Sequence, residues 1–331
     1  MNWQWFEQTM ECNERINGLR HELPTYLHPH YLRALQHSTA DPIGLLTLTK
    51  DRHQATLAFA IRRTPNTVHL YSPYGASQWA GAKNLEPLAP CFLEFCEAID
   101  ATTVYHPCGF HSGGDHAFKW FFSEDVFPHY THYFWPLTGT PSDKLKNSHP
   151  THRRLMKQWT EQRPRWCLHH QKLQRAFLQL YPPFIQSKKA NTHYHFHQDT
   201  LSQWLQAPQT LLVGCEHEGS IEAVGWYWIN GAQADYFLFA STPDGRRHGR
   251  AIHYMAAELA QQLGCTEMNL GGGITPNDAL ARFKRHFGTE ARQSWVAKSV
   301  INSDAFQRLG GVPAQSFERF PRYTGFPSYC M

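Results

Sequence analysis

Three consecutive segments in the second half of the chain are rich in apolar, β-branched and aromatic residues and are separated by polar turn residues. This pattern predicts strands at 210–217, 221–229 and 234–240. Asn230-Gly231 joins the last two segments, and this dipeptide tolerates the positive φ of a tight hairpin turn. The pattern therefore predicts an antiparallel meander of three strands.

The period then changes to that of a helix. Apolar residues in 252–263 recur every three or four positions and so fall on one helix face. A short strand is predicted at 267–270, and a last strand at 294–301. Between them, Thr275-Pro276 is typical of a helix start, with a capping hydroxyl and proline at the first helical position, and it predicts a helix over 277–286. The predicted order is β-β-β-α-β-α-β.

The first half of the chain repeats this order more faintly. The corresponding segments are strands at 43–49, 55–62 and 67–71, a helix at 88–99, a strand at 102–106, a loop at 110–115 and a strand at 130–137. We therefore expect two tandem α/β (α+β) domains, each a mixed, mostly antiparallel sheet flanked by helices. The expected bounds are 1–165 and 166–331, with the boundary in a basic helical stretch over 149–174. The tail, 304–331, could pack back on the first domain.

Composition narrows the class of protein. With 331 residues, 41% of them hydrophobic and 18% charged, the chain is expected to fold. Its net charge of +4 is too small to predict a dedicated nucleic-acid-binding protein. It has no apolar stretch long enough to cross a membrane, and its first residues lack a signal-peptide pattern. The eight cysteines form no CxxC pair, which favours reduced thiols and a cytoplasmic location.

A basic segment between the third strand and the first helix is the first candidate for chemistry. It reads R-x-x-G-x-A and comprises Arg246, Arg247, Gly249, Arg250 and Ala251. Unpaired N–H groups and the helix dipole favour an anion at a helix start, and glycine lets the backbone approach it closely. The alternative is a solvated basic helix start.

The second candidate follows the strand at 267–270. Three glycines, Gly271-Gly272-Gly273, let the backbone pass close to a ligand, and Asp278 and the adjacent pair Phe283-Lys284 come next. Taken singly, Phe283 would be a core residue and Lys284 a surface residue.

Both segments resemble known families. R-x-x-G-x-A after an aromatic third strand resembles the acyl-CoA pyrophosphate loop of GNAT acyltransferases. The string from Asn269 to Gly288, with its glycine cluster, acidic residue, F-K and final F-G, resembles the C-terminal signature of the Fem peptidyltransferases (FemA, FemB and FemX) and their BioF2-like relatives. Tyr71–Gly75 and Ser148–Met156 resemble two further Fem segments, so the likeness touches both halves.

This resemblance implies two GNAT-like units in tandem and an enzyme that transfers an acyl group to an amine, forming an amide. FemA and FemB carry a long helical arm for which this chain has no room, so its length is closer to FemX. No cofactor is expected to stay bound. The acyl donor would be aminoacyl-tRNA or acyl-CoA, and the acceptor an amine of a cell-envelope or secondary-metabolite precursor.

The resemblance also implies roles for individual residues. Lys284 would stabilise charge near the donor's carbonyl or leaving group, and either Asp278 or Asp235 could accept a proton. Donor binding is expected from Arg246, Arg247, Gly249, Arg250, Ala251, Gly272, Gly273 and Phe283. Acceptor binding is expected from Tyr74, Tyr227, Tyr236 and Arg153, although the tyrosines could equally be core aromatics.

The sequence leaves the donor open. F-K and the glycine cluster favour aminoacyl-tRNA, whereas R-x-x-G-x-A favours acyl-CoA. Two other classes of protein are alternatives. One is a non-catalytic binding module with the GNAT fold. The other is a metalloenzyme, because His193, His195 and His197 would share one face if they lay on a strand, although no partner spacing supports a metal and none is expected.

Overall fold

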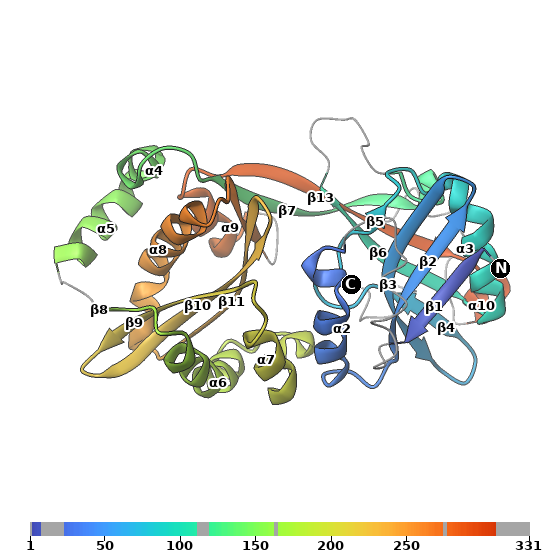
Figure 1. The fold of residues 1–331 in the computed structure, drawn as a ribbon, viewed down its shortest axis with the longest axis horizontal. Helices are drawn as coiled ribbons and strands as arrows, with labels where there is room; N and C mark the ends of the chain where they lie inside the picture. Colours follow the sequence, from blue (N-terminus) through green and yellow to red (C-terminus); the bar gives the residue numbers. More distant parts are fainter. Residues whose placement is uncertain (1, 8–22, 111–118, 162–164, 274–276, 309–331) are drawn as a thin grey trace. The chain divides into compact units, whose positions relative to one another are not determined.

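The computed structural model describes residues 2–7, 23–110, 119–161, 165–273 and 277–308 (Figure 1). The chain divides into two units. Unit 1 comprises 1–129 and 293–331, and unit 2 comprises 130–292. Residue 165, where the sequence places the domain boundary, lies inside unit 2.

Unit 1 is a mixed sheet covered by helices. The strand order is β1 (Trp3–Glu7), β2 (Ile43–Lys50), β3 (His53–Arg63), β4 (Val68–Tyr71), β6 (Thr103–Phe110) and β13 (Glu290–Val300), with β5 (Ala80–Gly81) beside β3. The β4–β6 pair is parallel and the others are antiparallel. The helical segments are η1 (Thr25–Leu27), α2 (Pro29–Gln36), η2 (Glu86–Leu88), α3 (Ala89–Ala98), η3 (Ser123–Asp125) and α10 (Ser303–Arg308).

Runs of apolar residues predicted most elements of this unit. β2, β3, β4, α3 and β6 occur where the sequence predicts them, and the aromatic side chains of α3 pack with those of the sheet in one core. Phe110, expected to begin a loop, still belongs to β6, and the rest of that expected loop lies outside the described residues. The predicted tail lies outside them from residue 309 onwards.

The strands of unit 2 are also mixed in direction. The strand order is β7 (Val126–Pro136), β12 (Glu267–Gly272), β11 (Gln233–Ser241), β10 (Ser220–Asn230), β9 (Thr210–His217) and β8 (Arg165–Cys167), and only β11–β12 is parallel among these pairs. The helical segments are α4 (Pro141–Asn147), α5 (Pro150–Glu161), α6 (His170–Ser187), η4 (Thr192–Tyr194), α7 (Gln198–Leu205), η5 (Asp244–His248), α8 (Gly249–Gln262) and α9 (Ala279–Arg285). The antiparallel meander β9–β10–β11 is confirmed.

Three local expectations need correction. The hairpin turn is Gly231-Ala232, because Asn230 pairs with Gln233, and Gly231 is the residue with positive φ. The stretch expected to be wholly helical contains strand β8, which pairs with β9. His193, His195 and His197 do not lie on a strand.

A local hydrogen bond explains the last of these corrections. The Nδ1 atom of His197 accepts a hydrogen bond from the backbone N–H of Asp199 and so caps α7. The segment before it turns through η4. Its three imidazoles therefore do not share a strand face.

Two further observations concern the cysteines and the helices. Six cysteines, all buried, form no disulfide with one another: Cys91, Cys96, Cys108, Cys167, Cys215 and Cys265. In the part of the chain that the structure describes, no helix is both long enough and apolar enough to cross a membrane.

Candidate functional site

Strands β11 and β12 of unit 2 run side by side for only three residues. The parallel pairing begins at Gln233 and Glu267 and ends at Asp235 and Asn269, after which each strand continues with other partners. The two strands therefore part in the middle of the sheet, and the side chains that follow Asp235 and Asn269 border the place where they separate.

Asp235 is the last residue of β11 that pairs with β12. Its buried carboxylate accepts hydrogen bonds from the side-chain amides of Asn230 (2.9 Å), Gln233 (2.7 Å) and Asn269 (3.2 Å). Burial raises the pKa of Asp235, and the three amide donors oppose that shift. Through Oδ1 the carboxylate joins β11 to Asn269 of β12, and through Oδ2 it joins β11 to Asn230 of β10.

Lys284 reaches the point where the strands part. Asp278 caps α9 by accepting the backbone N–H of Ala281 at 2.7 Å, and Lys284 lies in the last turn of this short helix. Its Nζ donates to the carbonyl oxygen of Gly272 at 2.6 Å and lies 5.8 Å from the ring centroid of Tyr236. The ammonium group therefore lies between the residue that follows Asp235 on β11 and the end of β12.

Burial changes the acidity of this lysine. The side chain is only 5% exposed, and desolvation lowers the pKa of Lys284 to about 7, against the opposing charge of Asp278. Gly271 has a positive φ of +72°, and a Cβ there would lie 3.2 Å from Nζ, so glycine at this position also leaves the ammonium its space. A buried lysine that titrates near neutral pH is typical of a functional site.

An imidazole missed by sequence analysis joins the other candidates. The Tyr227 hydroxyl and Nδ1 of His253 are 2.7 Å apart, and the His253 ring packs edge-on against Tyr236 at 4.7 Å between centroids. The same ring lies 5.9 Å from Phe283. His253 is buried on α8, and burial, followed by the charges of Lys284 and Arg250, lowers the pKa of His253 to about 3. The signal in the sequence that could have identified His253 is a histidine among the apolar residues of the helix predicted at 252–263.

The R-x-x-G-x-A segment is helical rather than an open loop. η5 runs directly into α8, and the N–H of Gly249 donates to the carbonyl oxygen of Arg246. Arg247 and His248 both contact Glu222, at 3.4 and 2.8 Å, and the Nη2 of Arg246 lies 3.4 Å from the Ser187 hydroxyl.

The side chains of Arg250 and Ala251, the next two residues of this segment, have different surroundings. Ala251 is buried in the apolar core of unit 2. The guanidinium of Arg250 instead covers the Phe283 ring at 5.6 Å. Among the loop arginines, Arg250 is therefore the one placed beside the F-K pair.

The remaining candidates are separated. Gly272 and Gly273 follow one another at the end of β12, and a Cβ on Gly272 would approach the Thr131 carbonyl oxygen to 3.0 Å. Arg153 donates to the carbonyl oxygens of Lys146 (2.8 Å) and Ser148 (2.7 Å), so it ties α4 to α5. Tyr74 lies in unit 1, where its carbonyl oxygen accepts the Tyr31 hydroxyl at 2.8 Å.

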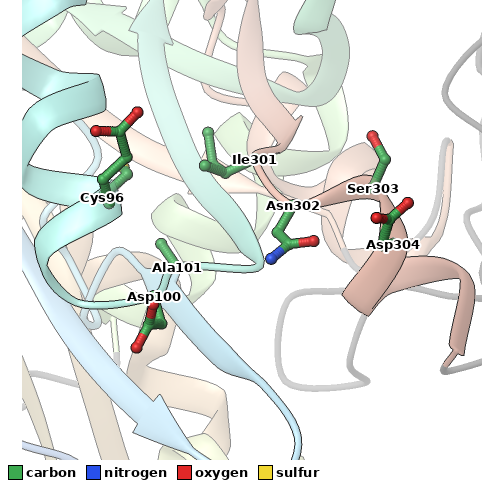
Figure 2. A pocket seen from close by; sticks show the side chains of 8 residues that line it. Cys96, Asp100, Ala101, Ile301, Asn302, Ser303 and Asp304 are labelled. Carbon is green, nitrogen blue, oxygen red and sulfur yellow. The ribbon is translucent and has the colours of Figure 1, made fainter.

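A hollow of about 450 Å³ lies in unit 1 (Figure 2). It is lined by Cys96, Glu97, Asp100, Ala101, Ile301, Asn302, Ser303 and Asp304, none of which the sequence singled out. Across the described ranges, no group of histidine, cysteine, aspartate or glutamate side chains is arranged to hold a metal ion.

No family model and no curated protein matches this sequence. Solved structures do match. FemX superimposes with a TM-score of 0.67 at 10% identity, over 93% of this chain and all of FemX. L-PGS from Bacillus licheniformis gives a TM-score of 0.57 at 12% identity, covering 88% of this chain and 92% of that one. The C-terminal domain of a putative lysylphosphatidylglycerol synthetase from Agrobacterium fabrum gives 0.55 at 12% identity, covering 87% and 91%.

These matches define the fold of the chain. It has the tandem, GNAT-like α/β fold of FemX, which confirms the expected fold class and, at the level of the fold, the resemblance to the Fem family.

Proposed function

We propose that this chain is an acyltransferase that moves an aminoacyl group from the ester of an aminoacyl-tRNA to an amine. The buried Lys284 ammonium at the point where β11 and β12 part is the observation that carries the proposal. The fold shared with FemX and with L-PGS supports it.

The chemistry follows from the position of the ammonium group. The amine attacks the ester carbonyl carbon, a C–N bond forms, and negative charge develops on the carbonyl oxygen. Lys284 has three N–H donors, and one of them is held by Gly272, so two remain to bind that oxyanion. The C–O bond to the ribose then breaks, the amine loses a proton, and the ribose oxygen gains one, which gives an amide and free tRNA.

We assign the proton transfer to Asp278 rather than to Asp235. Asp235 accepts three amide hydrogen bonds, which occupy both of its oxygens within the sheet. Asp278 lies at the start of α9, and its charge acts on Lys284. In this scheme Asp235 is a structural residue, and Tyr227 and Tyr236 shape the acceptor side of the site.

The start of α8 favours the tRNA donor over acyl-CoA. A pyrophosphate at a helix start binds to backbone N–H groups that have no other acceptor. Here the N–H of Gly249 donates to Arg246 and the N–H of Gly245 donates to the Thr242 hydroxyl. The acceptor amine would belong to a cell-envelope or secondary-metabolite precursor, and the reaction would take place in the cytoplasm.

A donor comparison tests this proposal. Purified protein is given an amine-containing small-molecule extract with either a mixed pool of charged tRNAs or a panel of acyl-CoA esters, and new amides are sought by mass spectrometry. We expect new amides from charged tRNA alone. Amides formed from acyl-CoA alone would show that acyl-CoA, and not aminoacyl-tRNA, is the donor. The absence of amides with either donor would favour a non-catalytic binding module.

A further inference from the structure

A buried imidazole with no partner lies beside the proposed site. His152 of α5 is 0% exposed, and neither ring nitrogen has a hydrogen-bond partner in the part of the chain described. Its ring packs against Phe287 at 4.5 Å, His286 at 5.2 Å and Phe283 at 5.6 Å. A buried polar group without a partner is costly, so a side chain of this kind is expected to have a ligand or a function.

An arginine shares this neighbourhood. The Nε of Arg250 is also buried without a hydrogen-bond partner, and within the described ranges no carboxylate pairs with its guanidinium. Arg250 and His152 both contact the Phe283 ring, and the charge of Arg250 acts on His152. Two unpaired donors from different helices therefore lie next to the residue that precedes Lys284.

The surroundings of these two residues are positively charged. His149 stacks on His286 at 4.2 Å, and Arg250, Arg282 and Arg285 all act on His286. The carboxylates among the described residues make no ion pair with any of these groups. A cluster of cations and imidazoles that lacks a carboxylate favours an anionic ligand.

His106 of unit 1 provides a contrast. Both of its ring nitrogens are likewise buried without a partner, but its neighbours are the aromatic rings of Trp120, Trp79 and Phe59. Burial dominates its lowered pKa and no charged neighbour contributes. An unpartnered imidazole alone is therefore not a ligand site, and the arginine beside His152 makes the difference.

We propose that Arg250 and His152 form a subsite for a phosphate group of one of the substrates. This deepens the proposed function, since the subsite adjoins Phe283 and Lys284. Phosphate oxygens accept the Nε–H of Arg250 and a ring N–H of His152, the two donors that have no acceptor otherwise. The phosphate belongs either to the backbone of the donor RNA or to a nucleoside diphosphate.

Direct binding of inorganic pyrophosphate tests the subsite without any turnover. We expect calorimetric titration to show binding to the full chain, weakened at least tenfold in Arg250→Gln and in His152→Phe. His106→Phe controls for the loss of a buried imidazole, and Arg63→Gln, in unit 1, for the loss of one positive charge outside this cluster; both are expected to change the affinity less than twofold. Circular dichroism checks that each variant is folded. Arg250 is only partly buried, so Arg250→Gln is expected to fold and still tests the subsite if His152→Phe unfolds.

Two competitors identify the source of the phosphate. Displacement of pyrophosphate by a short RNA ending in CCA would assign the subsite to the donor, and displacement by ADP would assign it to a nucleotide-linked substrate. The proposal is overturned if pyrophosphate does not bind, if neither competitor displaces it, or if Arg246→Gln abolishes binding while the Arg250 and His152 variants do not. Because no acyl transfer is measured, these outcomes are independent of those for Lys284.

Discussion

Lys284 is held in a place that is unfavourable for its charge. Among the described residues, the carbonyl oxygen of Gly272, the face of the Tyr236 ring and the charge of Asp278 compensate only in part for the loss of water around its ammonium group. A methionine of similar length would fill the same space without a charge. The lysine therefore reduces the stability of unit 2, which is expected when a residue serves a site rather than the fold.

The pH dependence of stability tests this view. The folded-state pKa of about 7 lies below the ordinary value of 10.5, so below pH 7 the folded protein must carry the buried charge at its full cost. Between pH 7 and 10.5 the folded state has released the proton while the unfolded state keeps it, so stability rises with pH. Relative to wild type, we expect Lys284→Met to be more stabilising at pH 6 than at pH 10, by about 3–4 kcal/mol.

Urea unfolding at the two pH values measures this difference. Titration of all other groups is common to both proteins and cancels in the comparison. An equal effect of the substitution at pH 6 and pH 10 would show that the pKa of Lys284 is not lowered in the folded protein.

Sequence reasoning identified some residues of the site and missed others. Phe283 and Lys284 stood out because adjacent F-K after a glycine cluster is a local pattern. His152 and His253 did not, because each reaches the site from a different helix, and only tertiary packing brings α5 and α8 to Phe283. Tyr227 and Tyr236 were singled out, but their link through His253 depends on the register of β10 with β11.

At the scale of single elements, the start of α8 differs most from expectation. The R-x-x-G-x-A pattern suggested that Gly249 is needed for close approach of an anion. A Cβ on Gly249 would instead meet only the ring of Phe239, at 3.5 Å, which is ordinary contact. The glycine that the fold requires is Gly245, where a Cβ would lie 2.1 Å from the carbonyl oxygen of Glu222.

A pair of alanine substitutions separates these two glycines. We expect Gly249→Ala to stay folded and to gain about 0.5–1 kcal/mol, since alanine favours a helix more than glycine does. Gly245→Ala is expected to lose at least about 2 kcal/mol, because backbone must move to relieve the contact. Thermal unfolding of both variants gives the result, and a Gly249→Ala variant less stable than Gly245→Ala would contradict it.

Local patterns predicted strands better than turns and caps. Strands β9, β10 and β11 contain runs of consecutive buried residues, so both of their faces are covered, and the apolar and aromatic runs bounded by turn residues predicted them. The segment around His195 alternates between histidine and aromatic residues, but the side chain of Asn191 accepts the backbone N–H of His193 and so favours a turn. Side-chain hydrogen bonds to nearby backbone compete with a strand, and the alternation pattern does not register them.

At the scale of the whole molecule, the two units do not correspond to the first and second halves of the chain. Unit 1 takes its last strand from the far end of the described sequence, because β13 pairs with β6. No local pattern predicts which distant strand completes a sheet. The repeated order of elements in the two halves was predictable, but the pairing of β13 with a strand of unit 1 was not.

Unit 2 is a continuous segment with its own apolar core. The buried residues of that core all lie between Tyr133 and Phe287. We therefore expect the fragment 130–292 to fold by itself, with a cooperative thermal transition and the dispersed amide spectrum of a folded protein. A fragment that is unfolded under conditions where the full chain is folded would contradict the division into units.

The role of Lys284 in amide formation is the central claim, and a matched pair of variants tests it most directly. Lys144 is also buried, at 2% exposure, and contacts the side chain of Gln261 on α8, away from the residues of the proposed site. The measurement is the single-turnover rate of amide formation from charged tRNA. We expect Lys284→Met to lower it at least a hundredfold and Lys144→Met to leave it within a few fold. Equal rates for Lys284→Met and wild type would contradict the claim.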